Sequence, residues 1–468
     1  MMAAEAFDTI VIGAGQAGPA IAAKLATQGR KVALVESREL GGTCVNRGCT
    51  PTKTLRKSAR VAHLARRAAE FGVEIGPVHI NFEVAMQRMQ TRVDESRAGL
   101  ASWLGGLAGL TIVKEHGRLA GRAGNDFLVE AGSRTFQAPM VVLNTGTRSF
   151  VPPIAGLTDH PFLDNESLLK LRELPRKLVI IGGGYISLEM GQIFRRLGSE
   201  VSIIEIGPRL AAREDHDVSA AIADMLHAEG IELHMGVTIE RVLPGETEGG
   251  ACVEMADGRL IAGSHLLVAV GRAPNTDDLG LERVGLTTNE RGYLLTNERL
   301  ETGVPGIWAL GDINHRGVFT HTSYHDHDIL AENLDGGHRS ADARNSIYAM
   351  FTDPPLAHVG LYEADAKRLV ADQGRRISQA VYAMKEVSRA KEESETTGVI
   401  KLLIDEDTGL FLGATMLWIS ADEVIQAIGL VMASNGSWRQ VREALPVHPT
   451  VTELLPTIID RRKPLAAA

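Results

Sequence analysis

The sequence feature that most constrains the fold is a glycine fingerprint that follows an apolar run near the start of the chain. Residues 7–12 are rich in apolar and β-branched side chains and predict a buried parallel strand, and residues 19–29 are compatible with a helix. Between them, Gly13 permits a tight turn, Gly15 lets the backbone approach a pyrophosphate, and Gly18 lets the helix lie close to its strand. We therefore predict a dinucleotide-binding unit whose helix N-terminus faces the phosphates.

An acidic residue follows the next predicted strand, which covers residues 31–35. This residue is Glu36, and it lies at the distance from the fingerprint at which a carboxylate bonds a ribose hydroxyl in dinucleotide-binding units. Strand, glycine turn, helix and acid thus occur in the order that such a site requires. We expect Glu36 to contact the ribose of the first nucleotide.

A second copy of this pattern lies far downstream. Residues 177–181 predict a strand, and residues 182–187, Gly-Gly-Gly-Tyr-Ile-Ser, open a helix. Gly182 and Gly184 take the first two glycine positions, while Ser187 replaces the third and is small enough for close helix–strand packing. Two dinucleotide sites in one chain imply electron transfer between two cofactors.

The second copy also has an acid after its next strand, residues 200–204. Glu205 can bond a free ribose 2′-hydroxyl but would repel a 2′-phosphate, which favours NAD(H) over NADP(H). Arg209 lies close in sequence and weakens this inference.

Cysteine is rare, with three residues in 468, and two of them lie five positions apart. Cys44 and Cys49 closely follow the first fingerprint, so we expect a thiol pair beside a bound cofactor. The number is too small for a disulfide scaffold, which leaves redox chemistry or metal binding. Metal is the weaker choice because no second pair with ligand spacing follows. Cys252 lies in an alternating segment and is expected to be a small core residue.

Over essentially the whole chain, these motifs resemble the flavin-dependent pyridine nucleotide–disulfide oxidoreductases, the class of dihydrolipoyl dehydrogenase, glutathione reductase and mercuric reductase. Besides the two fingerprints, the resemblance rests on Gly-Gly-Thr-Cys-x4-Cys-x3-Lys at 41–53, Gly-Arg-Ala-Pro-Asn at 271–275, Ala-Leu-Gly-Asp at 309–312 and His-Pro-Thr-x-x-Glu at 448–453. It implies an α/β fold with two Rossmann-like FAD- and NAD-binding domains and a C-terminal α+β dimerisation domain. The implied domains are residues 1–150 and 271–345 for FAD, 151–270 for NAD(P), and 346–468 for dimerisation.

The resemblance also assigns roles at the cofactors. The first site would bind FAD, with Asp312 on the ribitol chain and Lys53 near the reactive flavin nitrogen, where its charge would stabilise the anionic reduced flavin. Glu189 would be the ion-pair partner of Lys53, and Tyr185 would cover the flavin until nicotinamide displaces it. The remaining cofactor-binding residues of the two sites would be Gly42, Thr43, Thr145, Gly146, Gly271 and Arg272.

By the same resemblance, hydride passes from NADH to FAD and then to a Cys44–Cys49 disulfide. Cys49 would be the thiol next to the flavin, and Cys44 the thiol that exchanges with substrate. His448 is the expected base, since a histidine with an ordinary pKa of about 6.5 exchanges protons near neutral pH, and Glu453 would fix its tautomer. In the family this pair comes from the neighbouring subunit, so we expect a homodimer with shared active sites.

The substrate would be a small-molecule or protein disulfide, or another thiol-reactive oxidant. Pro-Thr-Lys after Cys49, Arg-Glu-Asp at 213–215 and Phe-Thr-Asp-Pro at 351–354 resemble the mercuric-reductase-like branch, which also contains flavoenzymes of the reactive-chlorine response. Residues 461–468 lack the vicinal cysteine pair of mercuric reductases. Three alternatives stay open: a dihydrolipoyl dehydrogenase, a mercuric or cupric ion reductase, and a flavin-bound scaffold without turnover.

Several histidines follow Asp312, where the family usually has an apolar helix start. They are His315, His321, His325 and His327. Imidazoles at this density could bind a transition metal such as copper, be solvated, or shape a substrate pocket. We assign no residue as a metal ligand.

Composition and local patterns complete the expectations. Hydrophobic residues make up 44% of the chain, enough for several cores, and the net charge of −9 argues against nucleic-acid binding. With no signal-like start and no apolar run of ~18 residues, neither secretion nor a membrane span is expected, and the cytoplasm is the expected location. We also expect long helices at 54–71 and 84–104, a hairpin of strands 398–404 and 410–417, and a helix at 421–434.

Overall fold

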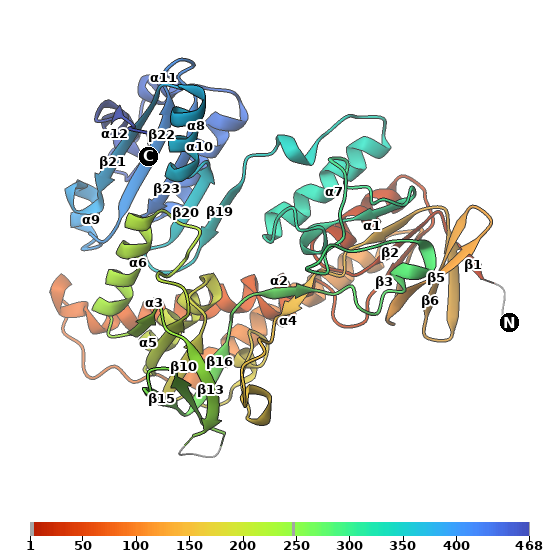
Figure 1. Ribbon diagram of the computed structural model, residues 1–468, viewed down its shortest axis with the longest axis horizontal. Coiled ribbons are helices and arrows are strands. Elements are labelled where there is room, and N and C mark those ends of the chain that lie inside the picture. Colours follow the sequence, from red (N-terminus) through yellow and green to blue (C-terminus); the bar gives the residue numbers. More distant parts are fainter. Residues whose placement is uncertain (1–3, 246–248, 468) are drawn as a thin grey trace.

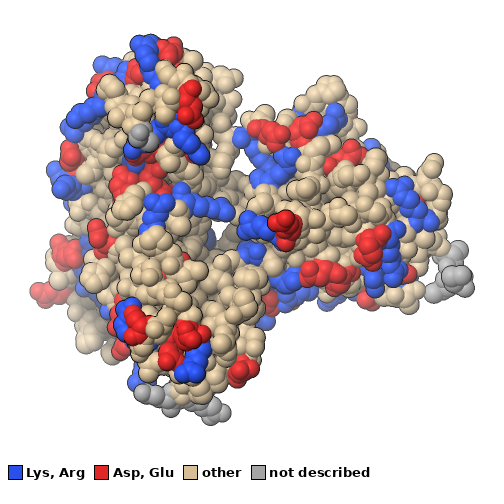
Figure 2. Space-filling view, in the orientation of Figure 1, with Lys and Arg blue, Asp and Glu red and all other residues tan. Residues whose placement is uncertain are grey.

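The chain folds into three lobes, as a computed structural model that describes residues 4–245 and 249–467 shows. In Figure 1 the first nucleotide-binding lobe lies on the right, the second at the lower left, and the C-terminal lobe in blue above the second. In Figure 2 basic and acidic side chains are intermingled on the visible face, and the surface is hollowed between the C-terminal lobe and the first lobe.

The first lobe is built on a parallel sheet whose strand order is β18-β8-β2-β3-β4. Helices α1 (Ala17–Thr27) and α7 (Thr320–Leu334) pack together over one face, and a four-stranded layer, antiparallel except for the β1–β7 pair, covers the other. Both faces are therefore buried, which explains why the central strands are apolar throughout. The parallel strands are β2 (Thr9–Ile12), β3 (Val32–Val35), β4 (Leu110–Val113), β8 (Val141–Leu143) and β18 (Ile307–Ala309). The covering layer is β1 (Glu5–Ala6), β5 (Gly117–Ala123), β6 (Asp126–Ala131) and β7 (Arg134–Ala138).

The second lobe repeats this layering. Its four-stranded parallel sheet, ordered β12-β11-β10-β16, packs against α5 (Tyr185–Leu197) and α6 (His216–Ala228) on one face and a three-stranded sheet on the other. The parallel strands are β10 (Lys177–Ile181), β11 (Glu200–Glu205), β12 (Glu232–Met235) and β16 (His265–Val268). The covering strands are β13 (Ile239–Pro244), β14 (Ala251–Met255) and β15 (Leu260–Gly263). A short antiparallel pair joins the two lobes, β9 (Thr147–Ser149) with β17 (Arg272–Pro274).

The C-terminal lobe is an antiparallel sheet, ordered β19-β20-β23-β22-β21-β24, with helices against it. The expected hairpin is confirmed as β22 and β23, and the expected helix at 421–434 as α10. The strands are β19 (Ile347–Met350), β20 (Leu356–Gly360), β21 (Ile377–Ala383), β22 (Val399–Asp405), β23 (Phe411–Leu417) and β24 (Lys463–Pro464). The helices are α8 (Glu363–Gln373), α9 (Ser388–Glu392), α10 (Ala421–Ala433), α11 (Trp438–Glu443) and α12 (Leu455–Asp460).

Three helices connect the first lobe to the others. The short α2 (Gly42–Arg47) leads into α3 (Cys49–Arg66), which packs against α4 (Phe82–Gly105) and α5. The sequence predicted that the first long helix begins at residue 54, and this start was wrong. The helix begins at Cys49 because Pro51 lies in its first turn, where the missing N–H would have no helical partner anyway. No helix in the described part of the chain combines the length and hydropathy of a membrane span.

Candidate active site

The glycines of the first fingerprint are required by close backbone contacts. Gly13 has a φ of 99°, in the region that favours glycine. A Cβ on Gly18 would lie 2.1 Å from the carbonyl oxygen of Gly13, so any side chain there would push α1 off the loop. A Cβ on Gly42 would lie 2.7 Å from the Cα of Gly15, so the start of α2 rests directly on the fingerprint.

A buried asparagine that the sequence analysis missed holds the first loop in place. Asn144 follows β8, and its Oδ1 accepts a hydrogen bond from the Gly18 N–H at 2.9 Å while its Nδ2 donates to the Leu310 carbonyl at 2.7 Å. One side chain thereby joins α1 to the segment after β18. Its signal in the sequence is a polar residue directly after an apolar strand, which is weak by itself.

Glu36 lies at the end of β3 and binds the backbone of the fingerprint loop. Its Oε2 accepts from the Ala14 N–H at 2.7 Å, and its Oε1 accepts from the Arg38 N–H at 2.7 Å. The sequence predicted contact with a ribose hydroxyl, and the structure adds that the carboxylate organises the loop. The acid therefore lies where the adenosine end of a dinucleotide would bind.

Asp312, in the 3-10 turn Gly311–Asn314 after β18, is a partly buried acid. Its Oδ2 accepts from the Thr147 hydroxyl at 2.9 Å, and burial raises its pKa. Arg272 donates to Thr147 Oγ1 and to the Thr147 carbonyl, both at 2.6 Å, and burial lowers the pKa of Arg272. Next to them, Thr145 donates to the Asn275 carbonyl at 2.8 Å.

These residues fit FAD. The glycine loop and the acid at its base suit the adenosine diphosphate half, and the carboxylate of Asp312 can accept from the hydroxyls of a ribitol chain. A Cβ on Gly146 would meet nothing within 4 Å, so the backbone there is open to a ligand.

The dithiol segment is attached to the same loop. The Gly41 N–H donates to the Ala14 carbonyl at 2.8 Å, and Gln16 Nε2 donates to the Gly41 carbonyl at 3.0 Å. These bonds place α2, which carries Cys44, against the first fingerprint, with Cys49 as the first residue of α3. Both cysteines are free thiols and half-buried, and the neighbouring Thr43 is exposed.

The two thiols have opposite protonation preferences. The pKa of Cys49 is lowered to about 6 by the hydrogen bond from Cys44, by the Thr320 hydroxyl at 3.1 Å and by the charge of Lys53. The pKa of Cys44 is raised by the hydrogen bond of Cys44 with Cys49 and by burial. These contacts favour the thiolate on Cys49 and the proton on Cys44.

Two helix N-termini favour this thiolate. Cys49 is the first residue of α3, and Thr320, which contacts its sulfur, is the first residue of α7. The positive end of a helix dipole stabilises a nearby anion and lowers the pKa of a cysteine. Thr320 was not predicted from the sequence, because nothing local connects it to a thiol 271 positions away.

The structure pairs Lys53 and Glu189. Lys53 Nζ lies 2.8 Å from Glu189 Oε2, and the other oxygen of Glu189 accepts from the Phe351 N–H at 2.7 Å. Lys53 Nζ also lies 4.5 Å from the centre of the Phe351 ring. The lysine is thus held between a buried carboxylate and an aromatic face, one helical turn after Cys49.

The second fingerprint is built on the same plan. Gly182 has a φ of 111°, and Glu205 Oε2 accepts from the Gly183 N–H at 2.5 Å while its Oε1 accepts from the Gly207 N–H at 2.6 Å. A Cβ on Gly184 would meet nothing within 4 Å, so the N-terminus of α5 is open to a phosphate. These features fit a second dinucleotide. Ser187 is buried, with Oγ 3.5 Å from the Ala269 carbonyl, and Gly271, after β16, has a φ of 143°.

Tyr185 is the first residue of α5, and its phenol is bonded to an acid that the sequence analysis did not single out. Its hydroxyl donates to Glu214 Oε1 at 2.5 Å. Its ring lies 6.4 Å from that of Phe319, the residue before Thr320. Tyr185 therefore lies between the second fingerprint and the segment that contacts the thiolate.

His448 and Glu453 pair within the C-terminal lobe. His448 Nδ1 lies 3.0 Å from Glu453 Oε2, while the imidazole is 80% exposed. A carboxylate on Nδ1 leaves Nε2 available, and its exposure leaves it accessible to a second chain.

No group with metal-like spacing among the described residues includes the four histidines after Asp312. Each has its own partner along α7 and the turn before it. His315 lies against the Tyr293 ring, His321 against the Ile347 carbonyl, His325 against Arg339, and His327 against the Tyr324 carbonyl.

Among residues 4–245 and 249–467, one group has metal-like spacing, Asp215, Asp217 and Glu363. Lys401 lies in its centre, with Nζ at 2.9, 2.9 and 2.5 Å from the three carboxylates. An ammonium thus occupies the position that a cation would take.

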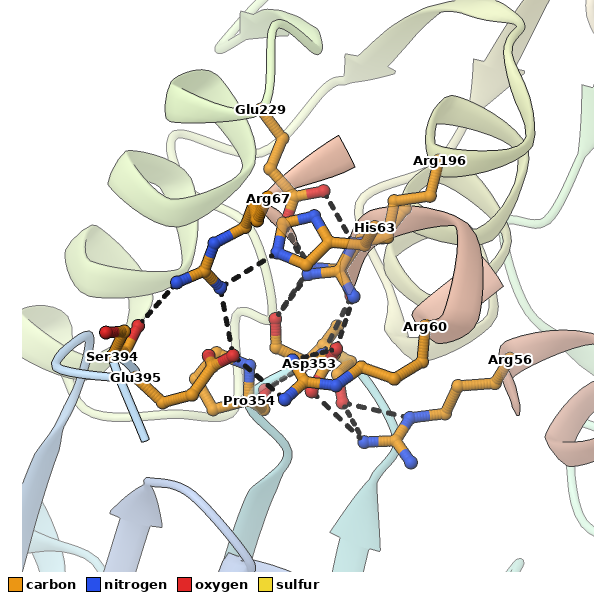
Figure 3. Close-up of polar contacts among 12 residues, drawn as sticks. Arg56, Arg60, His63, Arg67, Arg196, Glu229, Asp353, Pro354, Ser394 and Glu395 are labelled. Carbon is orange, nitrogen blue, oxygen red and sulfur yellow. Dashed lines mark hydrogen bonds and ion pairs between the residues drawn. The ribbon is translucent and has the colours of Figure 1, made fainter. Parts of the chain in front are cut away.

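An ion cluster fixes α3 to both other lobes (Figure 3). Arg60 Nη1 lies 2.9 Å from Asp353 Oδ2 and its Nη2 2.8 Å from Glu395 Oε1, both in the C-terminal lobe. Arg196 of α5 pairs with the same Asp353 and, at 2.8 Å, with Glu229. We call these five residues the α3 ion cluster. Cys49 and Lys53 continue the same stripe of α3, because positions three or four apart share a helix face.

The sequence and structure match known proteins over nearly their full length. Residues 7–326 match the family described as pyridine nucleotide-disulphide oxidoreductase, and residues 347–459 match its dimerisation domain. The probable pyridine nucleotide-disulfide oxidoreductase RclA of Escherichia coli is 33% identical over 96% of this chain and 98% of its own. Its structure as a Cu(II) complex, described as an HOCl-induced flavoprotein disulfide reductase, superposes with a TM-score of 0.87 over 97% of this chain and 99% of its own.

Two other relatives have different activities. The dihydrolipoyl dehydrogenase of Chlamydia muridarum is 32% identical over 96% of this chain and 95% of its own. The mercuric reductase of Streptomyces lividans is 34% identical over 96% of this chain and 94% of its own. With its two nucleotide sites, its dithiol and its dimerisation domain, the chain belongs to the pyridine nucleotide-disulphide oxidoreductase family of flavoenzymes.

Proposed function

We propose that the chain is an NADH-dependent flavoprotein disulfide reductase that delivers electrons through Cys44 and Cys49 to a disulfide or another thiol-reactive oxidant. The observation that carries this proposal is the dithiol attached to the first fingerprint loop, with the sulfur of Cys49 3.1 Å from the Thr320 hydroxyl and both residues at helix N-termini. Residues 1–150 and 271–345 would form the FAD domain, 151–270 the coenzyme domain and 346–468 the dimerisation domain.

When bound, FAD would supply hydride transfer between the nicotinamide and the dithiol. Lys53, fixed by Glu189, would place a positive charge at the flavin, and Thr320 would hold the thiolate on Cys49. Cys44 becomes the nucleophile once its proton is removed, since the thiolate is the reactive form.

The base for this step would come from the second subunit. His448, oriented by Glu453, is exposed in the single chain, and the family's dimerisation domain carries it. A homodimer would bring this imidazole to the dithiol of the partner, so that each active site needs both chains.

NADH is the proposed coenzyme. Glu205 is held at the base of the second fingerprint by two backbone N–H groups, where its charge would oppose a 2′-phosphate. The Arg209 guanidinium donates to the Ala212 carbonyl at 2.8 Å, so one of its donors is already used. Because the few cysteines and the free thiols suit a reducing compartment, the cytoplasm is the proposed location.

Two other reactions are supported by particular observations. The His448–Glu453 pair is the group that a dihydrolipoyl dehydrogenase would use, and such an enzyme is among the relatives. Cupric ion is supported by the Cu(II) complex of RclA, because soft thiolates bind copper. Turnover with dihydrolipoamide and NAD⁺, or NADH oxidation driven by Cu(II), would distinguish these from disulfide reduction.

An anaerobic titration of the flavin-loaded protein with NADH tests the proposed function. At two-electron reduction we expect a long-wavelength thiolate-to-flavin band in the wild type and in Cys252→Ser, the matched control outside the dithiol. Cys49→Ser should bleach directly without this band. If NADH bleaches the flavin directly in all three proteins, the dithiol relay is contradicted. If NADH bleaches the flavin in none of them, the scaffold alternative is supported.

A further inference from the structure

Glu214 is a buried acid beside the second nucleotide site that the proposed electron path does not use. It lies three residues after Ala211, whose N–H donates to the Gly183 carbonyl of the fingerprint at 2.8 Å. Only 1% of Glu214 is exposed, although it forms no ion pair within 4 Å among the described residues. Such a carboxyl needs a particular environment to be tolerated.

That environment consists of two phenols. The hydroxyls of Tyr185 and Tyr348 both donate to Oε1 of Glu214 at 2.5 Å, and Oε2 is buried with no hydrogen-bond partner in the described structure. A third phenol, Tyr362, bonds the hydroxyl of Tyr348. An ionised carboxylate would leave a charged oxygen unsatisfied, so this arrangement suits the neutral acid. Burial correspondingly raises the pKa of Glu214.

The bond to Tyr185 lies across the route between the two cofactor sites. Tyr185 is at the N-terminus of α5, directly after the glycine loop, and Glu189, which holds Lys53, is one turn further along the same helix. In the proposed function, a nicotinamide that reaches from the loop toward Lys53 would pass the Tyr185 ring, because Tyr185 lies between the loop and Glu189 on α5. The ring can move aside only if its hydroxyl leaves Glu214.

We propose that Glu214 is a positioning residue that latches the Tyr185 ring across the coenzyme site, and that coenzyme entry breaks the Tyr185–Glu214 hydrogen bond. This inference rests on the proposed function, because it takes the second site as the NADH site. The latch lowers coenzyme affinity by the strength of one hydrogen bond and keeps the route closed when no coenzyme is bound.

The C-terminal lobe supplies a second donor to Glu214. Tyr348 lies on β19, and its ring packs against those of Phe319 and Tyr185, at 5.0 and 5.6 Å. Because Tyr348 holds the same oxygen of Glu214, the position of the acid depends on how the C-terminal lobe packs against the second lobe.

The test measures NAD⁺ binding to the oxidised, flavin-loaded protein by isothermal titration calorimetry, which needs no turnover. Tyr185→Phe keeps the ring and removes only the latch, so its Kd for NAD⁺ should fall about threefold to tenfold, the equivalent of one hydrogen bond. Tyr348→Phe keeps the Tyr185–Glu214 bond and should stay within twofold of the wild type. Tyr382→Phe, the same change inside the C-terminal lobe, is the matched control.

Glu214 itself gives a second, independent comparison. Glu214→Leu should lower the Kd as Tyr185→Phe does, and Glu214→Gln, which keeps the accepting oxygen, should restore a value close to that of the wild type. An unchanged or higher Kd in Tyr185→Phe, with flavin fully bound, would overturn the latch. Failure of the wild type to bind NAD⁺ at all would instead overturn the proposed function.

Discussion

The two nucleotide sites share one backbone plan and differ in the segment that follows the acid. In both, the acid accepts from the second residue of the loop, Glu36 from Ala14 and Glu205 from Gly183. In both, the following segment donates an N–H to the carbonyl of that loop residue at 2.8 Å. Three residues after the residue that donates this N–H, the first site has Cys44 and the second has Glu214. The shared plan places a reactive thiol at one site and a latching acid at the other.

The helices after the two loops differ in the same way. Helix α1 is almost entirely buried and is built from small or aliphatic side chains, with Lys24 as its one charged residue. Helix α5 carries Tyr185, Glu189, Gln192 and Arg196, each bonded to a residue outside the helix. The first helix serves binding and packing, and the second also joins the three lobes.

The largest expected effect comes from exchanging the third fingerprint positions. Gly18→Ser places a Cβ 2.1 Å from the Gly13 carbonyl, and it should lower the free energy of unfolding by about 3 kcal/mol or more and abolish flavin retention. Ser187→Gly should cost about 1 kcal/mol, as an added glycine in a helix does. Urea unfolding and the flavin content after desalting measure both. Equal losses in the free energy of unfolding would mean that the two loops tolerate the exchange equally well, and the comparison between them would fail.

The second prediction concerns the connections of α5. Asp353→Asn removes the partner of Arg196 and Arg60 in the α3 ion cluster and should lower the free energy of unfolding by about 3 kcal/mol at neutral pH. Lys24→Gln on α1 is the control, and its effect should be within about 0.5 kcal/mol.

The same variant has a pH signature. Burial acts to raise the pKa of Asp353, but the charges of Arg196 and Arg60 hold it below its ordinary value. Its contribution to stability is therefore present above the ordinary aspartate pKa of about 3.9 and is lost as the pH falls through the lower folded value. The difference in the free energy of unfolding between the wild type and Asp353→Asn should therefore disappear in acid. A difference that stays constant with pH would exclude this electrostatic origin.

A third prediction sharpens the description of the first site. Thr320→Val removes the hydroxyl that bonds Cys49 and should raise the pKa of that thiol from about 6 by about one. The pH dependence of alkylation by iodoacetamide in the reduced protein reports this pKa. Thr322→Val, on the same helix, should leave it unchanged. If the pKa of Cys49 is the same in Thr320→Val and in Thr322→Val, Thr320 does not stabilise the thiolate.

The smallest expected effect concerns the latching acid. Since burial raises the pKa of Glu214, its contribution to stability is complete below the ordinary glutamate pKa and is lost as the pH rises through the folded value. Glu214→Gln cannot ionise, so its Tm relative to the wild type should increase with rising pH. Parallel Tm curves from acid to alkaline pH would show that Glu214 does not take up a proton on folding.

Local patterns in the sequence were sufficient for the two glycine fingerprints and the acids that follow them, whereas the three-domain fold and most of the site roles came from the family resemblance. Both fingerprints, their acids and the strands around them were predicted because apolar periodicity and glycine spacing are local. Lys53 and Glu189, 136 positions apart, were paired only through the family resemblance, and the structure places them in contact.

Other site residues lie in positions that no local pattern marks. Thr320 and Glu214 act on residues of distant segments, and Asn144 is one polar residue after one strand among many. The histidines after Asp312 are close in sequence, and His321 and His325 share a face of α7, yet each has a separate partner.

The edge strand β18 determines the order in which the chain can be assembled during synthesis. β18 (Ile307–Ala309) completes the first parallel sheet by pairing with β8, whereas all four parallel strands of the second sheet lie between Lys177 and Val268. As the chain leaves the ribosome, the second sheet has all of its parallel strands available before the first has its last one. The nascent chain can therefore complete the second parallel sheet while the first, begun earlier, still exposes the edge that β18 will cover.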